Sequence, residues 1–167
     1  KTPEGMLTRP TADRVKEAIF SITQFDIPTA SVLDLFGGTG QLGIEALSRG
    51  ANRAVFIDER EDACKLIKEN LKRTKLEAYG RVIRSDYMSY LKSCKDKFDI
   101  ILLDPPYAEV YLENSLKMIT EIDILQSGGI IVTERPVGKE LLCDFPGYSR
   151  SKDYKYSKTI LTIFRKD

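Results

Sequence analysis

The stretch from Val32 to Leu47 reads VLDLFGGTGQLGIEAL, and it decides the fold. An apolar run is followed by a turn in which Gly38, Gly40 and Gly43 have the spacing G-x-G-x-x-G, and an amphipathic segment comes next. Glycines at this spacing permit a tight turn between a strand and a helix, and they let a ligand approach the backbone closely. The stretch therefore predicts a strand, a glycine turn and a helix that together form a binding site.

The same alternation of strand and helix continues along the chain. We expect strands at 31–36, 53–57, 81–84, 98–103 and 129–134, and helices at 11–23, 41–49, 60–75, 88–94 and 111–122. Such alternation is typical of a mostly parallel sheet, and strands that are apolar on both faces suit a sheet covered on both sides. Residues 148–165 read as a terminal hairpin. The predicted fold class is α/β, with a Rossmann-like, doubly wound sheet in one domain spanning residues 1–167.

Composition narrows the class of protein. The 167 residues are 42% hydrophobic and 31% charged, which is typical of one globular domain, and no apolar run approaches the length of a membrane span. The chain begins with Lys, so we expect the natural protein to begin earlier. Its three cysteines are widely separated, as in a reduced, cytoplasmic protein. Since it has no histidine and no cysteine cluster, we expect no metal site.

The formal net charge is +1, but the basic residues are unevenly distributed. Residues 65–84 contain seven Lys or Arg against two acids, and residues 146–167 contain six against two. These two segments either form one patch that attracts phosphate or belong to ordinary solvated surfaces.

Acidic residues mark the ends of the predicted strands, where ligands bind in folds of this kind. Asp58 follows the glycine turn by about twenty residues and is placed to accept hydrogen bonds from ribose hydroxyls. Both a nicotinamide dinucleotide and S-adenosylmethionine fit this pattern. Asp34 favours the second, because a carboxylate there would repel a pyrophosphate and attract the ammonium of a methionine moiety. The alternative role for Asp34 is to accept hydrogen bonds from the amides of the glycine turn.

Asp86, which follows the third strand, also has two possible roles. Asp86 is placed to accept a hydrogen bond from an adenine amino group, with Tyr87 beside it. Asp86 also fits as the N-cap of the short helix that follows, and the two roles are compatible.

The fourth strand ends in Asp104-Pro105-Pro106-Tyr107. A carboxylate and the Pro105 carbonyl can each accept one N–H of an exocyclic amino group on a planar base, which turns the nitrogen lone pair away from the ring. The two prolines hold these acceptors in place before the reaction. Tyr107 offers a ring on which an extruded base can stack. We interpret the step as a site for methyl transfer to an amino group; the plainer alternative is a turn that starts a helix.

Four stretches, in this order and spacing, resemble the RsmD-like family of bacterial 16S ribosomal RNA guanine-N2 methyltransferases. They are RPTADRVKEAIFSI, VLDLFGGTGQLGIEALSRGA, FIDERE and LLDPPY. The resemblance implies a class I methyltransferase fold, with a seven-stranded sheet ending in an antiparallel pair. It also implies S-adenosylmethionine as cofactor, and ribosomal RNA or the assembling small ribosomal subunit as partner. The chain departs from the family where Tyr156-Ser157 stands in place of a frequent Tyr-Gly.

The resemblance also assigns roles to residues. Gly38 and Gly40 are implied at the methionine end of the cofactor, and Phe36 is expected among the cofactor-binding residues with Asp34. Asp58 is implied at its ribose, and Asp86 with Tyr87 at its adenine. Asp104 to Tyr107 are implied to hold the target guanine, and Arg9 and Thr11 to lie near the mouth of the site.

The residues themselves leave the substrate open between guanine N2 and adenine N6, on RNA or DNA. Two further classes of protein fit parts of the pattern. A nicotinamide-dependent oxidoreductase would use the same glycine turn but lacks a histidine for proton transfer. A non-catalytic RNA-binding module would be expected to lose the glycines or the acids, which this chain keeps.

Overall fold

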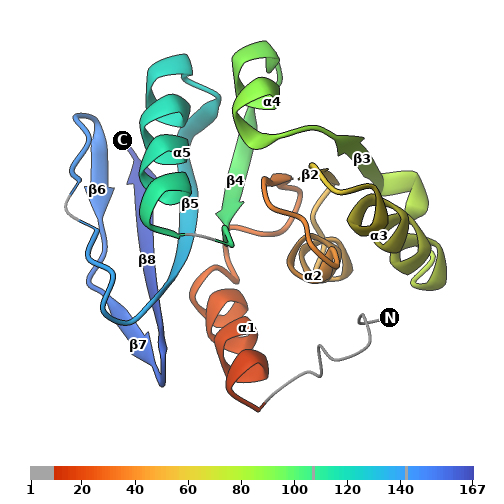
Figure 1. The fold of residues 1–167 in the computed structure, drawn as a ribbon, viewed down its shortest axis with the longest axis horizontal. Coiled ribbons are helices and arrows are strands. Elements are labelled where there is room, and N and C mark those ends of the chain that lie inside the picture. The colour runs from red at the N-terminus through yellow and green to blue at the C-terminus, as the bar shows by residue number, and fades with distance from the viewer. Residues whose placement is uncertain (1–9, 107, 142) are drawn as a thin grey trace.

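The computed structural model describes residues 10–106, 108–141 and 143–167. Its elements follow one another along the chain as a mixed α/β fold (Figure 1). The helices are α1 Pro10–Ile22, α2 Gln41–Ser48, α3 Glu61–Arg73, α4 Tyr87–Ser93 and α5 Ala108–Ile122, with a 3-10 turn at Glu77–Tyr79. The strands are β1 Ser31–Asp34, β2 Arg53–Asp58, β3 Gly80–Arg84, β4 Phe98–Leu103, β5 Leu125–Pro136, β6 Tyr148–Arg150, β7 Tyr154–Tyr156 and β8 Thr159–Lys166.

The strands form one sheet in the order β3-β2-β1-β4-β5-β8-β6. Neighbours from β3 to β5 are parallel, and β8 runs antiparallel to β5. This order confirms the doubly wound sheet and places β4 directly beside β1, as predicted. The sheet is seven strands wide, as the resemblance implied. Within the described residues the last position is shared by two short strands, β6 and β7, which pair with different parts of β8, so that the sheet has eight strand segments.

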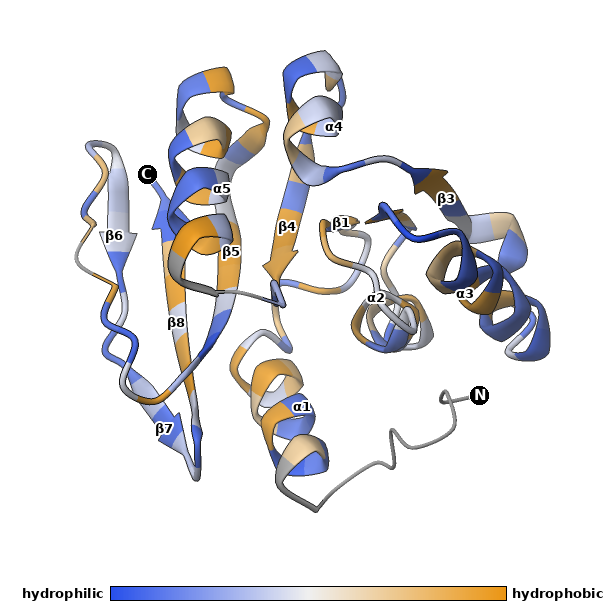
Figure 2. Cartoon of the chain, in the orientation of Figure 1, coloured by the Kyte–Doolittle hydropathy of each residue, from blue (hydrophilic) through white to orange (hydrophobic). Residues whose placement is uncertain are grey.

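Helices cover both faces of the sheet, which explains why the inner strands are almost uniformly apolar (Figure 2). On one face α1, α2 and α3 pack against residues such as Val32, Phe56 and Leu102. On the other face α4 and α5 pack against residues such as Leu33, Ile101 and Ile131. Successive residues of a strand point to opposite faces, so each strand supplies both cores. We call these the α1 face and the α5 face.

The glycine turn is fixed by backbone geometry and by close packing. Gly38 and Gly40 have φ values of 59° and 80°, a left-handed conformation in which a side chain is strained. Glycine is required at position 43 for a different reason, because this residue lies in α2 against the fully buried ring of Phe56. A Cβ at position 43 would lie 2.4 Å from Cε2 of that ring. The third glycine of the motif therefore sets the distance between α2 and the sheet.

Gly43→Ala should lower the free energy of unfolding by about 2 kcal/mol. Overpacking a tight core costs about 1–3 kcal/mol, which outweighs the gain of about 1 kcal/mol in helix propensity. Urea unfolding followed by circular dichroism measures the change. Phe56→Leu removes the ring that the new methyl group meets, so the double variant should lose less stability than the sum of the two single variants. Strictly additive losses would show that the ring is not the obstacle.

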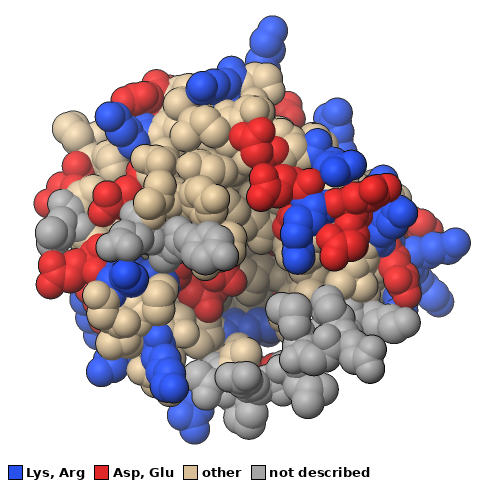
Figure 3. Space-filling view, viewed as in Figure 1, with Lys and Arg blue, Asp and Glu red and all other residues tan. Residues whose placement is uncertain are grey.

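The two basic segments do not form one patch. Residues 65–84 belong to α3 and β3 at one edge of the sheet, whereas residues 146–167 belong to β6, β7 and β8 at the other edge (Figure 1). On the face seen in Figure 3, basic and acidic side chains are intermixed. Within its own segment Arg73 is paired with Glu69 at 3.1 Å, and in the other segment Arg150 is paired with Asp153 at 3.4 Å. The order of the strands therefore supports the second interpretation, in which each basic segment belongs to an ordinary solvated surface.

Candidate active site

Four acidic residues gather at the carboxyl ends of adjacent strands. Asp34 is the last residue of β1 and Asp58 is the last residue of β2. Asp104 directly follows β4, and Glu134 lies near the end of β5. Because these strands are parallel neighbours, the carboxyl ends meet at one edge of the sheet, together with the glycine turn. The structure thus brings the predicted acids Asp34, Asp58 and Asp104 to one place.

Asp34 is the most deeply buried of the four, with 3% of its surface exposed. Its Oδ2 accepts a hydrogen bond of 3.3 Å from the amide of Gly43, in the first turn of α2. Asp34 thus makes the contact expected from its alternative role, in which it stabilises the glycine turn. Burial nevertheless raises the pKa of Asp34 to about 8, because one backbone donor offsets only part of the lost solvation, and Asp104 and Asp58 add repulsion. The site therefore contains a buried carboxyl group that a cation would stabilise in its ionised form.

Asp58 holds the glycine turn in place. Its Oδ2 accepts from the amide of Gly38 at 3.0 Å, and its Oδ1 accepts from the amide of Arg60 at 3.0 Å. The Gly37 amide also donates to the Ile57 carbonyl at 2.8 Å, so that the turn is tied to the end of β2. A carboxylate oxygen has a second lone pair, so these contacts leave Asp58 able to accept from a ligand hydroxyl.

Asp86 is the N-cap of α4, and its Oδ1 accepts from the amide of Ser89 at 2.9 Å. Hydrogen bonds from the side chain and then from the amide of Ser89 lower the pKa of Asp86. The following residue, Tyr87, belongs to an aromatic cluster at the same edge of the sheet, with its ring centroid 5.3 Å from that of Phe36 and 5.1 Å from that of Tyr111. Tyr111 was not predicted from the sequence. The cluster forms an apolar wall between the glycine turn and the start of α5.

The Asp-Pro-Pro step follows β4, with Pro105 buried and Pro106 exposed. Arg9 and Tyr107 lie outside the described residues, and Thr11 is in the first turn of α1. Asp104 is open to solvent on one side, yet the protein atoms around it raise its pKa to about 6. Its position beside β1 brings the step to the same edge as the glycine turn, as the sequence predicted.

Glu134 is a site residue that the sequence analysis missed. It is partly buried, and burial followed by repulsion from Asp104 raises its pKa to about 8. Glu134 and Asp104 are thus close enough to influence each other's ionisation. The signal in the sequence was the run GIIVTE, an apolar strand with an acid at its end, which repeats the pattern of the other three strands.

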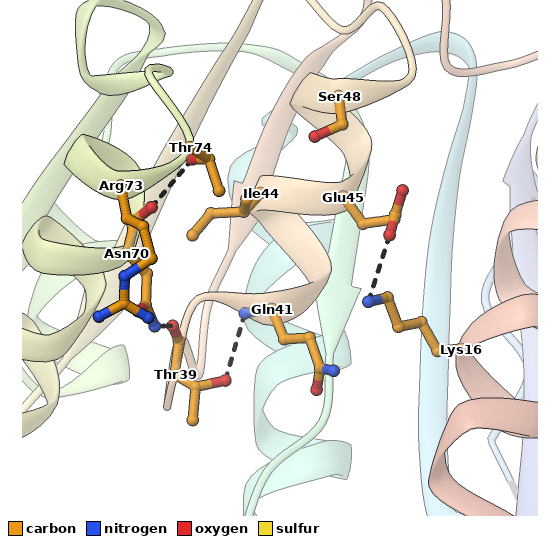
Figure 4. A pocket seen from close by; sticks show the side chains of 9 residues that line it. All are labelled: Lys16, Thr39, Gln41, Ile44, Glu45, Ser48, Asn70, Arg73 and Thr74. Carbon is orange, nitrogen blue, oxygen red and sulfur yellow. Dashed lines mark hydrogen bonds and ion pairs between the residues drawn. The ribbon is translucent and has the colours of Figure 1, made fainter. Parts of the chain in front are cut away.

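A cavity of about 290 Å³ lies near this edge but does not contain the predicted cofactor residues. It lies between α1, α2 and α3, and Figure 4 shows Lys16 reaching from α1 to Glu45 on α2, with nitrogen and oxygen 3.2 Å apart. On its other side Asn70 donates to the Thr39 carbonyl at 2.9 Å. The cavity borders the glycine turn at Thr39, away from the four acids.

Within the described ranges, no group of three or more His, Cys, Asp or Glu side chains is arranged to hold a metal ion. Likewise, none of the helices in the described part of the chain is long and apolar enough to cross a membrane.

Comparisons with known proteins show which proteins this chain is similar to. Residues 1–165 match the model of the family described as "Conserved hypothetical protein 95". The chain is 37% identical to "Putative rRNA methyltransferase YlbH" of Bacillus subtilis, over 99% of this chain and 92% of that protein. It is 33% identical to "Ribosomal RNA small subunit methyltransferase D" of Haemophilus influenzae, over 83% of this chain and 72% of that protein.

Solved structures show the same fold. The structure of "Putative methyltransferase yhhF" from Escherichia coli aligns with a TM-score of 0.90 at 26% identity, covering 100% of this chain and 90% of that one. The "putative methylase HI0767" from Haemophilus influenzae aligns with a TM-score of 0.81 at 28% identity, covering 94% and 99%. The chain therefore belongs to the family described as "Conserved hypothetical protein 95", the RsmD-like family that its motifs resemble.

Proposed function

We propose that this chain is an S-adenosylmethionine-dependent methyltransferase that acts on the exocyclic N2 amine of a guanine in small-subunit ribosomal RNA. The observation that carries the proposal is the meeting of Asp34, Asp58 and the Asp-Pro-Pro step at one edge of the sheet. Methyl transfer to an amine needs a cofactor site and an amine-binding step within reach of each other. The names of the relatives support methyl transfer to ribosomal RNA, and the resemblance supports guanine N2.

The residues fit the proposed cofactor. Asp34 is a buried carboxyl group whose charge the Gly43 amide offsets only in part, and the ammonium of the methionine moiety would compensate the rest. Gly38 and Gly40 keep the turn free of side chains, Asp58 offers acceptors to the ribose, and Phe36 and Tyr87 offer an apolar wall. A pyrophosphate fits less well, because Asp34 already places a carboxyl group at the first turn of α2.

The same residues explain how an amine would be activated. When bound, the cofactor supplies a methyl group on a sulfonium, which needs no further activation. Asp104 accepts one N–H of the target amine, and the carbonyl of Pro105 accepts the other. The rigid Pro105-Pro106 pair holds both acceptors in advance, so little ordering remains for the reaction itself.

The test is methyl transfer to 16S ribosomal RNA, both as free RNA and in small-subunit particles, isolated from cells that lack this protein. Purified protein and labelled S-adenosylmethionine are added, and the RNA is digested to nucleosides for mass spectrometry. We expect N2-methylguanosine to appear. Formation of N6-methyladenosine instead would overturn the guanine assignment, and transfer of no methyl group to either substrate would overturn the function.

Asp58→Ala should weaken the binding of S-adenosylmethionine by about 1.5–3 kcal/mol, the usual loss for a charge-assisted hydrogen bond. The variant should also melt at a lower temperature, since the carboxylate anchors the turn at Gly38. Calorimetry measures the affinity. Asp62→Ala, four residues further on, is the matched control because that side chain is 80% exposed. An affinity equal to that of the control would remove Asp58 from the cofactor site.

A further inference from the structure

The strand register places Asp104 and Glu134 next to each other. The register between β4 and β5 ends with Leu103 opposite Thr133, so the residues that follow, Asp104 and Glu134, are neighbours. Adjacent strands lie about 4.8 Å apart, which leaves room for a direct hydrogen bond between two carboxyl groups. By strand alternation Asp104 shares the α1 face with Leu102, and Glu134 shares it with Val132. The two carboxyl groups therefore lie on the same face of neighbouring strands, where each influences the ionisation of the other.

A hydrogen bond between two carboxyl groups requires a proton on one of them, because two carboxylates have acceptors only. Asp104 is exposed to solvent on one side, whereas Glu134 is partly buried within the sheet. The more solvated group keeps the negative charge more easily, so the proton resides on Glu134. Glu134 is then the donor and Asp104 the ionised acceptor.

We propose that Glu134 is a positioning residue that, in its protonated form, donates a hydrogen bond to Asp104 and holds that carboxylate for the substrate amine. The inference rests on the proposed function. One Asp104 oxygen is fixed by Glu134, and the other is left for the amine. Without this donor the Asp104 side chain is free to rotate, and the amine loses an acceptor that was held in place before the reaction.

The groups described on the same face as Glu134 are mostly apolar side chains and phenol rings. Its neighbour on β8 in the sheet register is Leu161. The apolar cluster on this face also contains Val15 and Ile19 of α1, with the phenol rings of Tyr154 and Tyr156 on β7 packed against it. Among the described residues, the charged group that acts on Glu134 is Asp104, and the next acid along the edge, Asp34, interacts with Asp104. Within the described residues, Glu134 thus has one charged partner, Asp104, and Asp34 is coupled to the pair through Asp104.

The experiment compares Glu134→Gln with Glu134→Leu. The amide of Gln still donates to Asp104, whereas Leu donates nothing. We expect Glu134→Leu to lower kcat by about 10- to 100-fold with little change in KM or in cofactor affinity, and Glu134→Gln to stay within about threefold of the original protein. Glu121→Leu, on the exposed side of the far end of α5, is the control. Equal losses in the Gln and Leu variants, or no loss in Leu, would overturn the inference.

The dependence of kcat on pH distinguishes this role of Glu134 from a purely structural one. In the original protein, kcat should fall on the alkaline side as the pair loses its shared proton, because Glu134 then repels Asp104 instead of donating to it. Glu134→Gln has no proton to lose there, so its alkaline decline should disappear while the acidic decline from Asp104 stays. An alkaline decline that is unchanged in Glu134→Gln would overturn the inference.

A measurement without substrate separates this inference from the proposed function. Carboxyl carbon NMR of the free protein should show Glu134 titrating well above an ordinary glutamate, and Asp104→Asn should move it back toward that range. Ordinary titration of Glu134 in the original protein would overturn the inference even if RNA is methylated. Absence of methyl transfer by the original protein would instead overturn the proposed function.

Discussion

Asp104→Ala should lower the rate of methyl transfer by about 10²- to 10³-fold, the usual effect of removing one preorganised polar group from a reaction centre. Cofactor affinity should stay within about tenfold, because Asp104 acts on the acceptor base in the proposed site. Single-turnover transfer from labelled cofactor to 16S ribosomal RNA measures the first quantity, and calorimetry measures the second. An equal loss of both would mean that Asp104 belongs to the cofactor site instead.

The chain offers a close control for this change. Asp96 precedes β4 at its opposite end, and its contact is an ion pair with Arg53 at 3.8 Å. Asp96→Ala therefore removes the same type of side chain from the same strand region, far from the carboxyl edge of the sheet, and should keep its activity. In the original protein the rate should also fall as the pH drops below about 6, where Asp104 takes up a proton and can no longer accept from the amine. That decline should be absent in whatever activity Asp104→Ala retains.

Much of this fold follows from local sequence patterns. The strand predicted at 98–103 agrees with β4 at both ends, because its apolar run is bounded by charged residues before it and prolines after it. The first strand ends at Asp34, two residues earlier than predicted, since the chain already turns toward the glycines there. The fifth strand begins at Leu125, not at 129, because the glycines at 128 and 129 lie within it, where the pairing with β4 changes register.

What the sequence did not reveal depends on pairing between distant segments. Each of the acids Asp34, Asp58 and Asp104 could be recognised beside a local motif, whereas Glu134 has meaning only once β5 is known to lie beside β4. Tyr111 is a similar case, since helical spacing does not show that its ring meets Tyr87 at 5.1 Å. For the same reason the sequence left open whether the two basic segments form one patch, because composition contains no information on the order of strands in a sheet.

The binding of S-adenosylmethionine should release a proton from Asp34. In the free protein, burial raises the pKa of this carboxyl group to about 8, so near pH 7 it is mostly protonated. An ammonium placed beside it favours the ionised form, and the proton leaves as the ligand binds. Affinity should therefore increase with pH, by up to about tenfold per unit below pH 8, because each binding event is coupled to one ionisation.

Calorimetry between pH 5.5 and 7.5, in two buffers with different heats of ionisation, measures this coupling. The upper limit is chosen because an α-amino group begins to lose its own proton near pH 7.7–8.0. Asp34→Asn should abolish the proton release and weaken binding by about 1.5–3 kcal/mol at pH 7.5, while Asp96→Asn should change neither. Affinity that is independent of pH in the original protein would place the ammonium elsewhere.

The same ionisation should govern the stability of the free protein, with the opposite dependence on pH. Asp34 has a pKa in the folded chain that is raised above its ordinary value of 3.8, so the folded state binds more protons than the unfolded state between about pH 4 and 8. The free energy of unfolding must then decrease as the pH rises through this window. Asp34→Asn should flatten the decrease, and saturating S-adenosylmethionine should reduce it in the original protein. Rising pH thus favours ligand binding and disfavours the free fold, and both follow from one buried carboxyl group at the end of β1.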